Sequence, residues 1–270
     1  MTRNVALVTG CSSGIGRATA VAFDVAGWRV WATARDPADV EALAARGCRT
    51  AALDVTDAGA VTAVVEEVVE TDGRIDCLVN NAGYGQAGVV EDVPHDRVLA
   101  QFDVNVFGCL RLIRAVLPRM RERGSGTIVN VSSVLGRVAY PTRGIYAGSK
   151  HAIEGVTDAL RVEVAGLGID AVVVEPGAVR TAFDERLFET EAAVDRSPAY
   201  ARAYDRIGRA QRLASRFGSS PDDVARVVVR AATADRPRAR YVVGFDARLV
   251  LWSRYLPTRL ADWLARRLTT

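Results

Sequence analysis

The chain is predicted to fold as one α/β domain around a doubly wound parallel sheet of about seven strands, with helices on both faces. Short apolar runs alternate with amphipathic stretches, which is typical of β–α units that build a parallel sheet. Runs such as Val172-Val173-Val174 also lack the polar–apolar alternation of a half-exposed strand, as expected of strands that are buried on both faces. No repeat, low-complexity tract or linker divides the 270 residues, so one domain is expected.

The predicted elements follow from these patterns in chain order. Strands are expected at 4–9, 28–34, 49–54, 76–80, 127–132, 169–175 and 240–244. Helices are expected near 14–26, 57–71, 96–123, 146–166 and 221–234. Two regions break the alternation: residues 182–218 mix charged and aromatic side chains, and residues 245–270 hold an apolar run followed by a helix from Pro257.

One face of this last helix is apolar. The spacing places Leu260, Trp263, Leu264 and Leu268 together on that face. Stripes at helical spacing are usually packed, so we expect the face to lie against the body of the protein or a partner subunit. A membrane surface is the less favoured alternative.

Composition excludes several classes of protein. The net charge of +3 is too small to indicate nucleic-acid binding. Four widely spaced cysteines and two histidines indicate neither a disulfide framework nor a metal site. No apolar run reaches the roughly 18 residues of a membrane span, and the first run is too short for a signal peptide. We therefore expect a cytoplasmic, reduced protein without a metal ion.

A glycine-rich turn follows the first predicted strand and opens the first helix. It reads Thr-Gly-Cys-Ser-Ser-Gly-Ile-Gly over residues 9–16. Glycines allow a tight turn and close approach to a phosphate, and free amides at the helix N-terminus bind one. The spacing G-x-x-x-G-x-G differs from the general dinucleotide fingerprint, so the turn alone is weak evidence. Strand, turn and helix in this order favour a nucleotide site.

The end of the second strand bears on the kind of nucleotide. An acidic residue there binds a ribose 2′-hydroxyl, whereas an arginine pairs with a 2′-phosphate. Arg35 follows the strand directly and Asp36 comes one position later, so NADP(H) is favoured over NAD(H). In the alternative interpretation Arg35 is a solvated loop charge, Asp36 binds the ribose and the cofactor is NAD(H).

Two further polar segments end strands at the same edge of the sheet, where ligands bind in such folds. Asp54 ends the third strand, and its carboxylate could accept a hydrogen bond from an adenine amino group; alternatively it caps the helix that starts near Asp57. The segment 80–83, Asn-Asn-Ala-Gly, ends the fourth strand.

The only lysine of the chain lies one helical turn after a tyrosine. The other 34 cationic side chains are arginines, yet Lys150 follows Tyr146 by four residues, so a helix places both on one face. A phenol has a pKa of about 10, and a nearby ammonium lowers it. The pair is therefore a candidate proton donor and acceptor, although a chance surface lysine is the plain alternative.

Three other positions have both plain and functional interpretations. Ser133 could donate to a substrate carbonyl or simply cap a turn, and Asn105 lies in a predicted helix where asparagine is unfavourable. Pro176-Gly177, with Thr181 beyond it, is either an ordinary turn or part of a site.

Taken together and in this order, these segments resemble the short-chain dehydrogenase/reductase family. The resemblance covers about Val5 to Thr181 through T-G-x-x-x-G-x-G, N-N-A-G, Ser133, Y-x-x-x-K and P-G-x-x-x-T. Within the family, segments 9–16, 81–85, 105–108 and 175–177 resemble the 17β-hydroxysteroid and retinol dehydrogenase branch, which interconverts lipophilic alcohols and ketones. The implied fold is a Rossmann-like sheet. Gly148 is a departure, because the family commonly has Ala-Ser-Lys here; glycine costs roughly 1 kcal/mol in a helix.

The resemblance implies a role for each matching residue. Tyr146 exchanges a proton with the carbonyl oxygen, Lys150 lowers the pKa of Tyr146 and binds the nicotinamide ribose, Ser133 polarises the carbonyl, and Asn105 holds a relay water. The implied cofactor-binding residues are Gly10, Ser12, Ser13, Gly14, Ile15, Gly16, Arg35, Asp54, Val55, Asn81, Ala82, Gly83, Tyr146, Lys150, Pro176, Gly177, Val179 and Thr181.

We call residues 182–218 the lid segment, because they are expected to fold over a lipophilic substrate. Its apolar side chains are expected either to line the pocket or to pack on the body; they are Phe183, Leu187, Phe188, Tyr200 and Tyr204. The resemblance also implies a homodimer or homotetramer through helices 96–123 and 146–166. A 3-oxoacyl or polyketide-type ketone reductase and a regulator that binds NADP(H) without turnover are the alternative functions.

Overall fold

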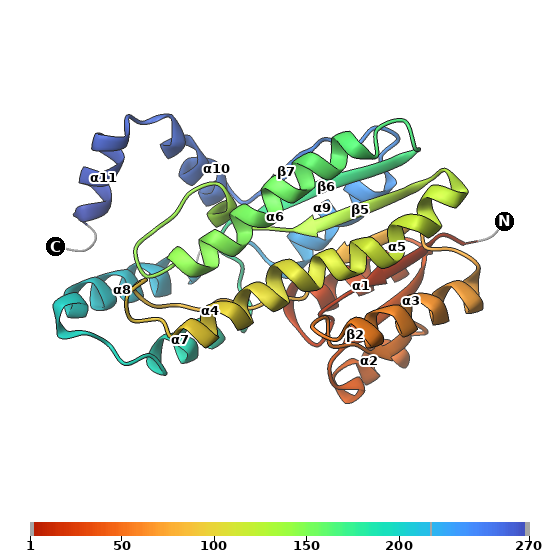
Figure 1. Ribbon diagram of the computed structural model, residues 1–270, viewed down its shortest axis with the longest axis horizontal. Coiled ribbons are helices and arrows are strands. Elements are labelled where there is room, and N and C mark those ends of the chain that lie inside the picture. The colour runs from red at the N-terminus through yellow and green to blue at the C-terminus, as the bar shows by residue number, and fades with distance from the viewer. Residues whose placement is uncertain (1–2, 217, 268–270) are drawn as a thin grey trace.

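Seven parallel strands form one sheet in the computed structural model, which describes residues 3–216 and 218–267 (Figure 1). The order is β3-β2-β1-β4-β5-β6-β7, so the predicted parallel α/β architecture is confirmed. The strands are β1 Val5–Val8, β2 Arg29–Ala34, β3 Arg49–Ala52, β4 Cys77–Asn80, β5 Gly126–Val131, β6 Ile169–Pro176 and β7 Arg240–Val243. The order reverses between β1 and β4, which is where such folds bind ligands.

Helices cover both faces of the sheet. One face carries α3 (Ala58–Asp72), α5 (Cys109–Arg123) and α6 (Gly144–Glu163). The other carries α1 (Gly14–Val25), α2 (Glu41–Ala44) and α9 (Pro221–Thr233), seen behind the sheet in Figure 1. Adjacent strand residues enter opposite cores: Leu78 packs with the first set of helices and Val79 with the second. Burial on both faces explains why the strands read as continuous apolar runs.

Local signals place the helix ends close to the predicted positions. Asp57 caps α3 by accepting hydrogen bonds from the amides of Gly59 (2.7 Å) and Ala60 (3.1 Å), and Gly73 ends the helix in the left-handed conformation. A capping box between Ser220 and Asp223 starts α9. The predicted helix 96–123 is three pieces: α4 (His95–Phe102), a π-helical turn η2 (Asp103–Gly108) and α5.

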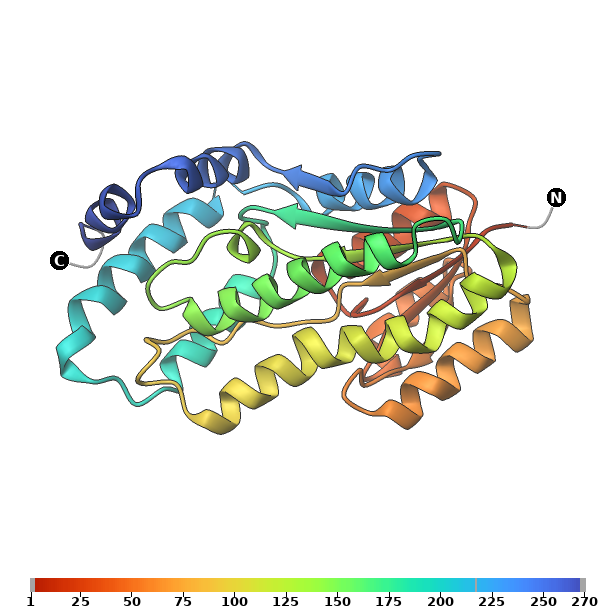
Figure 2. The same cartoon turned by 45° about the horizontal axis from the view of Figure 1, so that its top comes forward.

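The lid segment is helical. It contains α7 (Phe183–Ala192), a short 3₁₀ turn η4 (Pro198–Tyr200) and α8 (Ala201–Arg216). These helices lie with α4 at the end of the molecule away from the N-terminus (Figures 1 and 2).

The C-terminal segment is helical. It forms α10 (Phe245–Trp252), a 3₁₀ turn η5 (Ser253–Tyr255) and α11 (Thr258–Arg266). Leu260, Trp263 and Leu264 are 44%, 47% and 44% exposed, so the body covers this face only in part, and its packing against a partner subunit stays a prediction. Leu268 lies outside the described residues. Within the described ranges, no helix has the length and apolar character needed to cross a membrane.

Candidate active site

A pocket of about 1070 Å³ opens at the carboxyl edge of the sheet. Its walls come from the β1–α1 turn, the ends of the central strands, the start of α6, the lid helices α7 and α8, and α10. Every residue expected to bind a cofactor lines this pocket except Gly16. Of the four expected catalytic residues, Ser133, Tyr146 and Lys150 line it, and Asn105 does not.

The glycine-rich turn is built to approach a phosphate. Gly10 and Gly14 have φ values of 71° and 56°, a region that favours glycine. Gly16 does not face the pocket; a Cβ there would overlap the carbonyl oxygen of Gly10. The side-chain amide of Asn81 donates to the carbonyls of Thr9 (2.9 Å) and Gly10 (3.1 Å), which fixes the turn.

The backbone amides at the N-terminus of α1 lie next to this glycine-rich turn. Ser13 precedes α1 but makes no side-chain hydrogen bond to its first turn. The first amides of a helix lack partners within the helix and bind anions well. The residues present therefore fit the pyrophosphate of a dinucleotide.

Arg35 and Asp36 have different surroundings. Arg35 lines the pocket, whereas Asp36 accepts from the amide of Ala38 (2.9 Å) and caps the 3₁₀ turn η1 (Pro37–Val40). Asp54 also lines the pocket and accepts from the amide and hydroxyl of Thr56, which lowers the pKa of its carboxyl. Asp57, not Asp54, caps α3.

Tyr146, Ser133 and Lys150 meet deep in the pocket. All three are buried, being 7%, 9% and 7% exposed. Ser133 caps a 3₁₀ turn, by accepting from the amide of Leu135 (3.1 Å), and also lines the pocket, while its donation to a substrate carbonyl stays a prediction. The ammonium of Lys150 donates to the carbonyl of Val131 (2.9 Å), and burial lowers the pKa of Lys150 to about 8.

Burial dominates the electrostatics of Tyr146. The Lys150 Nζ lies 5.8 Å from the centre of the Tyr146 ring. Burial raises the pKa of the phenol well above its ordinary value, and a hydrogen bond with Ser133 acts in the opposite direction. Desolvation of the phenolate outweighs this hydrogen bond, and the expected lowering of the Tyr146 pKa by Lys150 stays a prediction.

Asn105 lies behind the pocket in the π-helical turn η2, which explains an unfavourable residue inside a predicted helix. Its side chain accepts from the amide of Tyr84 (3.1 Å) and donates to the carbonyl of Tyr84 (2.9 Å) and the hydroxyl of Ser149 (3.2 Å). Asn105 and Lys150 line one internal cavity of about 10 Å³. This is the lower limit for holding one water molecule.

The residues after β6, which form one wall of the pocket, are hydrogen-bonded to the C-terminal segment. Pro176, Gly177, Val179 and Thr181 line the pocket. Asp246 at the start of α10 accepts from the amide of Ala178 (2.7 Å), and its carboxylate occupies the space where a Cβ on Gly177 would lie. No sequence motif marked Asp246.

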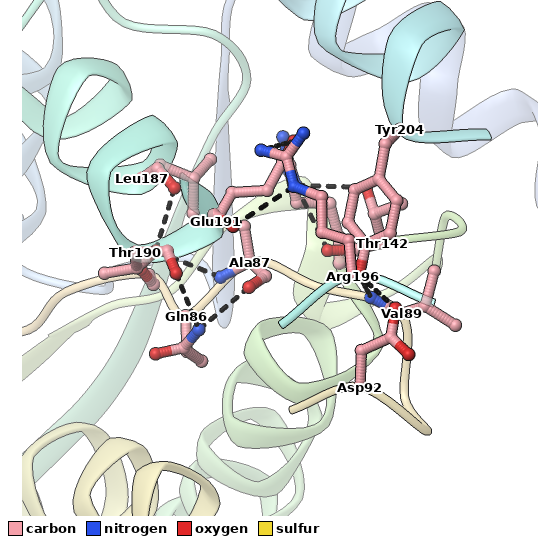
Figure 3. Close-up of polar contacts among 12 residues, drawn as sticks. Gln86, Ala87, Val89, Asp92, Thr142, Leu187, Thr190, Glu191, Arg196 and Tyr204 are labelled. Carbon is pink, nitrogen blue, oxygen red and sulfur yellow. Dashed lines mark hydrogen bonds and ion pairs between the residues drawn. The ribbon is translucent and has the colours of Figure 1, made fainter. Parts of the chain in front are cut away.

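The lid residues divide into two groups. Phe183 and Leu187 line the pocket, and the ring of Phe183 lies 5.5 Å from that of Tyr146. Tyr204 is 2% exposed and donates to Asp92 (2.6 Å), as Figure 3 shows, and Tyr200 donates to Glu91 (2.6 Å). Tyr200, Tyr204 and Phe188 do not line the pocket. The apolar-lining interpretation thus holds for two of the five.

A buried ion pair joins the lid to the loop before α6. Arg143 donates to Glu191 (3.0 Å) at the end of α7, and the two side chains are only 2% and 6% exposed. Arg143 also donates to the carbonyl (3.1 Å) and hydroxyl (3.0 Å) of Thr142, the one described non-glycine residue with positive φ, at 63°. Arg196 contacts Glu191 from the other side (3.4 Å) (Figure 3).

A second set of hydrogen bonds holds the lid to the loop after β4. Thr190 donates to the carbonyl of Gly85 (3.0 Å) and accepts from the amide of Ala87 (3.2 Å) (Figure 3). These lid contacts were not found from sequence, because each joins residues about 50 or 100 positions apart.

Comparison with known proteins agrees with this geometry. A family model described as "short chain dehydrogenase" matches residues 4–192. The chain belongs to the short-chain dehydrogenase family. It is therefore an NAD(P)-dependent dehydrogenase/reductase, an oxidoreductase acting on alcohol and ketone groups.

Three relatives illustrate the range of similar proteins. The chain is 38% identical to human 17-beta-hydroxysteroid dehydrogenase type 1 over 89% of this chain and 77% of that protein. It is 32% identical to the 3-ketodihydrosphingosine reductase of Bacteroides thetaiotaomicron, over 90% and 89%. A crystal structure of a short-chain dehydrogenase from Streptomyces avermitilis superposes with a TM-score of 0.83 at 35% identity, covering 100% and 96% of the two chains.

Proposed function

We propose that this protein is an NADP(H)-preferring oxidoreductase that interconverts a secondary alcohol and a ketone on a lipophilic substrate. One observation carries the proposal. Tyr146 and Ser133 line one pocket together with the glycine-rich turn and the apolar lid residues Phe183 and Leu187. One pocket can therefore hold a dinucleotide and an apolar substrate beside the two hydroxyl groups.

The proposed chemistry assigns a task to each buried group. The bound nicotinamide supplies or accepts the hydride. In the reducing direction Tyr146 gives its proton to the carbonyl oxygen, and Ser133 donates a hydrogen bond to the same oxygen. A phenol with an ordinary pKa of about 10 is protonated near neutral pH, as a proton donor must be. Asn105 and Lys150, which share the small cavity, are proposed to connect Tyr146 to solvent through a water.

Arg35 supports the preference for NADP(H). It is the cation at the end of β2 that lines the pocket, and Asp36 is already engaged in capping η1. A charge-assisted bond contributes roughly 1.5–3 kcal/mol, so Arg35→Asp should weaken NADPH binding by about 10- to 100-fold. NADH binding should stay the same or tighten. Equal affinity of the wild-type protein for both nucleotides would contradict this assignment.

The lipophilic substrate class is supported by the lining of the pocket. Phe183, Leu187, Val134, Leu135 and Ile207 give its substrate side an apolar character. Two similar proteins are named for a steroid and for a sphingoid base, both largely apolar molecules.

Turnover distinguishes this function from its alternatives. Nicotinamide absorbance should be followed with steroid ketones, long-chain 3-keto lipids and 3-oxoacyl thioesters, in both directions with the matching alcohols. We expect turnover of the apolar ketones, and Tyr146→Phe should abolish it while NADPH stays bound. Exclusive turnover of the thioesters would favour a 3-oxoacyl reductase. No turnover of any compound would favour a regulator that only binds the nucleotide.

The assembly and compartment are part of the same proposal. We expect a cytoplasmic homodimer or homotetramer formed through α4–α5 and α6. Sedimentation of the purified protein would test this, and a monomer at micromolar concentration would contradict it.

A further inference from the structure

The C-terminal segment, residues 245–267, presents large apolar side chains to solvent. On α10 the outward positions 245, 249 and 252 are spaced at i, i+4 and i+7, and Phe245, Leu249 and Trp252 are 82%, 65% and 65% exposed. Tyr255 in η5 is 84% exposed. Of the residues in α10, η5 and α11, only Ala247 is buried. Large exposed apolar side chains that recur along one segment in this way often mark a contact site.

Cations surround these apolar side chains. The segment contains five arginines and two aspartates, and Asp246 turns inward to the amide of Ala178. The arginines, all exposed, are Arg248, Arg254, Arg259, Arg266 and Arg267. Within residues 3–216 and 218–267, Arg248, Arg254 and Arg259 form no ion pair. The guanidinium of Arg267 lies 4.0 Å from the ring centre of Trp263.

We propose that residues 245–267 form a docking surface for an anionic lipid membrane. Tryptophan and tyrosine rings suit the boundary between headgroups and acyl chains, because one end is apolar and the other polar. Each arginine near an anionic leaflet adds electrostatic attraction to the membrane surface. The two short helices cannot cross a bilayer, so they would lie in the plane of its surface.

Charge favours lipid over a second copy of the chain. A two-fold contact would bring the same patch of each copy together. Five arginines and Asp262 would then face an identical set, with few acidic partners. An anionic leaflet instead meets every one of these cations with opposite charge.

The segment is placed next to the pocket. On α10, Asp246 and Val250, which are four residues apart, line the pocket, while Phe245 and Leu249 are exposed to solvent. Figures 1 and 2 show α10 and α11 at the lid end of the molecule, beside α8. One helix would thus contact the membrane on one side and the substrate pocket on the other. The surface would let the protein take a lipophilic substrate from the membrane, and this use rests on the proposed function. Membrane binding itself does not depend on the proposed function.

Flotation of the full chain with vesicles tests the proposal without cofactor or substrate. Vesicles of phosphatidylcholine with about 30% phosphatidylserine should bind the protein, and pure phosphatidylcholine vesicles should bind it much less. Binding should fall in about 0.5 M salt, where charges are screened beyond about 4 Å. Trp252→Ser with Trp263→Ser should weaken binding by at least about tenfold, since both side chains insert apolar area.

Two matched variants sharpen the test. Arg254→Gln with Arg259→Gln should weaken binding to the anionic vesicles and reduce its salt dependence. Val25→Ser, at a 76% exposed apolar position on α1, should bind like the wild type. Unchanged thermal midpoints would show that all variants fold.

Three results would overturn the proposal. They are the absence of wild-type binding to anionic vesicles, equal binding by the double tryptophan variant, and a dimer that dissociates when Trp252 and Trp263 are replaced. The last would mean that a second copy covers the surface. Because no turnover is measured, failure here leaves the proposed oxidoreductase activity standing.

Discussion

The buried ion pair between Arg143 and Glu191, which holds the lid, should contribute to both the stability of the protein and the binding of its substrate. Glu191→Gln keeps the shape of the side chain and removes its charge. The two partners are 2% and 6% exposed, so the guanidinium would remain in a nearly dry environment without its carboxylate. Burial already lowers the pKa of Arg143, and Glu191 counteracts this effect.

The expected decrease in the free energy of unfolding follows from these contacts. Removing one partner of a buried pair costs about 3–5 kcal/mol. The glutamine oxygen can still accept one hydrogen bond, and Thr142 retains its two, so we expect a loss of about 2–3 kcal/mol. Unfolding entropy of about 2.1 cal/mol/K per residue gives about 0.57 kcal/mol/K for a chain of this length. The midpoint of thermal unfolding should therefore fall by about 4–5 °C.

Thermal unfolding and steady-state kinetics would check this together. Glu185→Gln, on the exposed side of α7, is the matched control and should change stability by less than about 0.5 kcal/mol. In Glu191→Gln the KM for substrate should rise more than kcat falls, because α7 also carries Phe183 over Tyr146. The double variant Arg143→Met/Glu191→Met should recover much of the stability, since no buried charge is left unpaired. A midpoint shift under about 1 °C in Glu191→Gln would refute the reasoning.

Three further outcomes follow from the same structure. Lys150→Arg should lower kcat at least about 100-fold, because the ammonium donates to Val131 beside a cavity too small for the wider guanidinium; near-normal kcat would mean that any cation suffices. Gly148→Ala should raise the thermal midpoint by about 2 °C, since the new Cβ meets only the Phe102 ring at 3.7 Å, and a lower midpoint would contradict the stated cost of this glycine. Without added nucleotide, the free energy of unfolding should rise between about pH 8 and pH 10, because the folded pKa of Lys150 is depressed and the unfolded chain binds more protons there. Urea titrations across this range would measure the rise, and a slope that persists in Lys150→Met would show that another group causes it.

The sequence by itself determined the architecture and the chemistry-bearing motifs. Strand periodicity, the glycine-rich turn and the spacing of Tyr146 and Lys150 are local properties, because each depends on residues within a few positions of one another. Caps such as Asp57 and the Ser220–Asp223 box are equally local, so helix ends fall close to their predicted positions.

Only the tertiary structure decided how these parts act on one another. The pKa of Tyr146 rises because residues from distant segments exclude water from it, and neighbouring charges in the sequence could not show this. Arg143 meets Glu191, and Asp246 meets Ala178, across about 50 and 70 positions without any motif to mark them. The stripe on α11 was expected to pack on the body or on a partner subunit, and the body covers it only in part, because spacing says which residues share a face and not what covers it. Burial and side-chain contacts are properties of the folded chain, and they govern the electrostatics of this site.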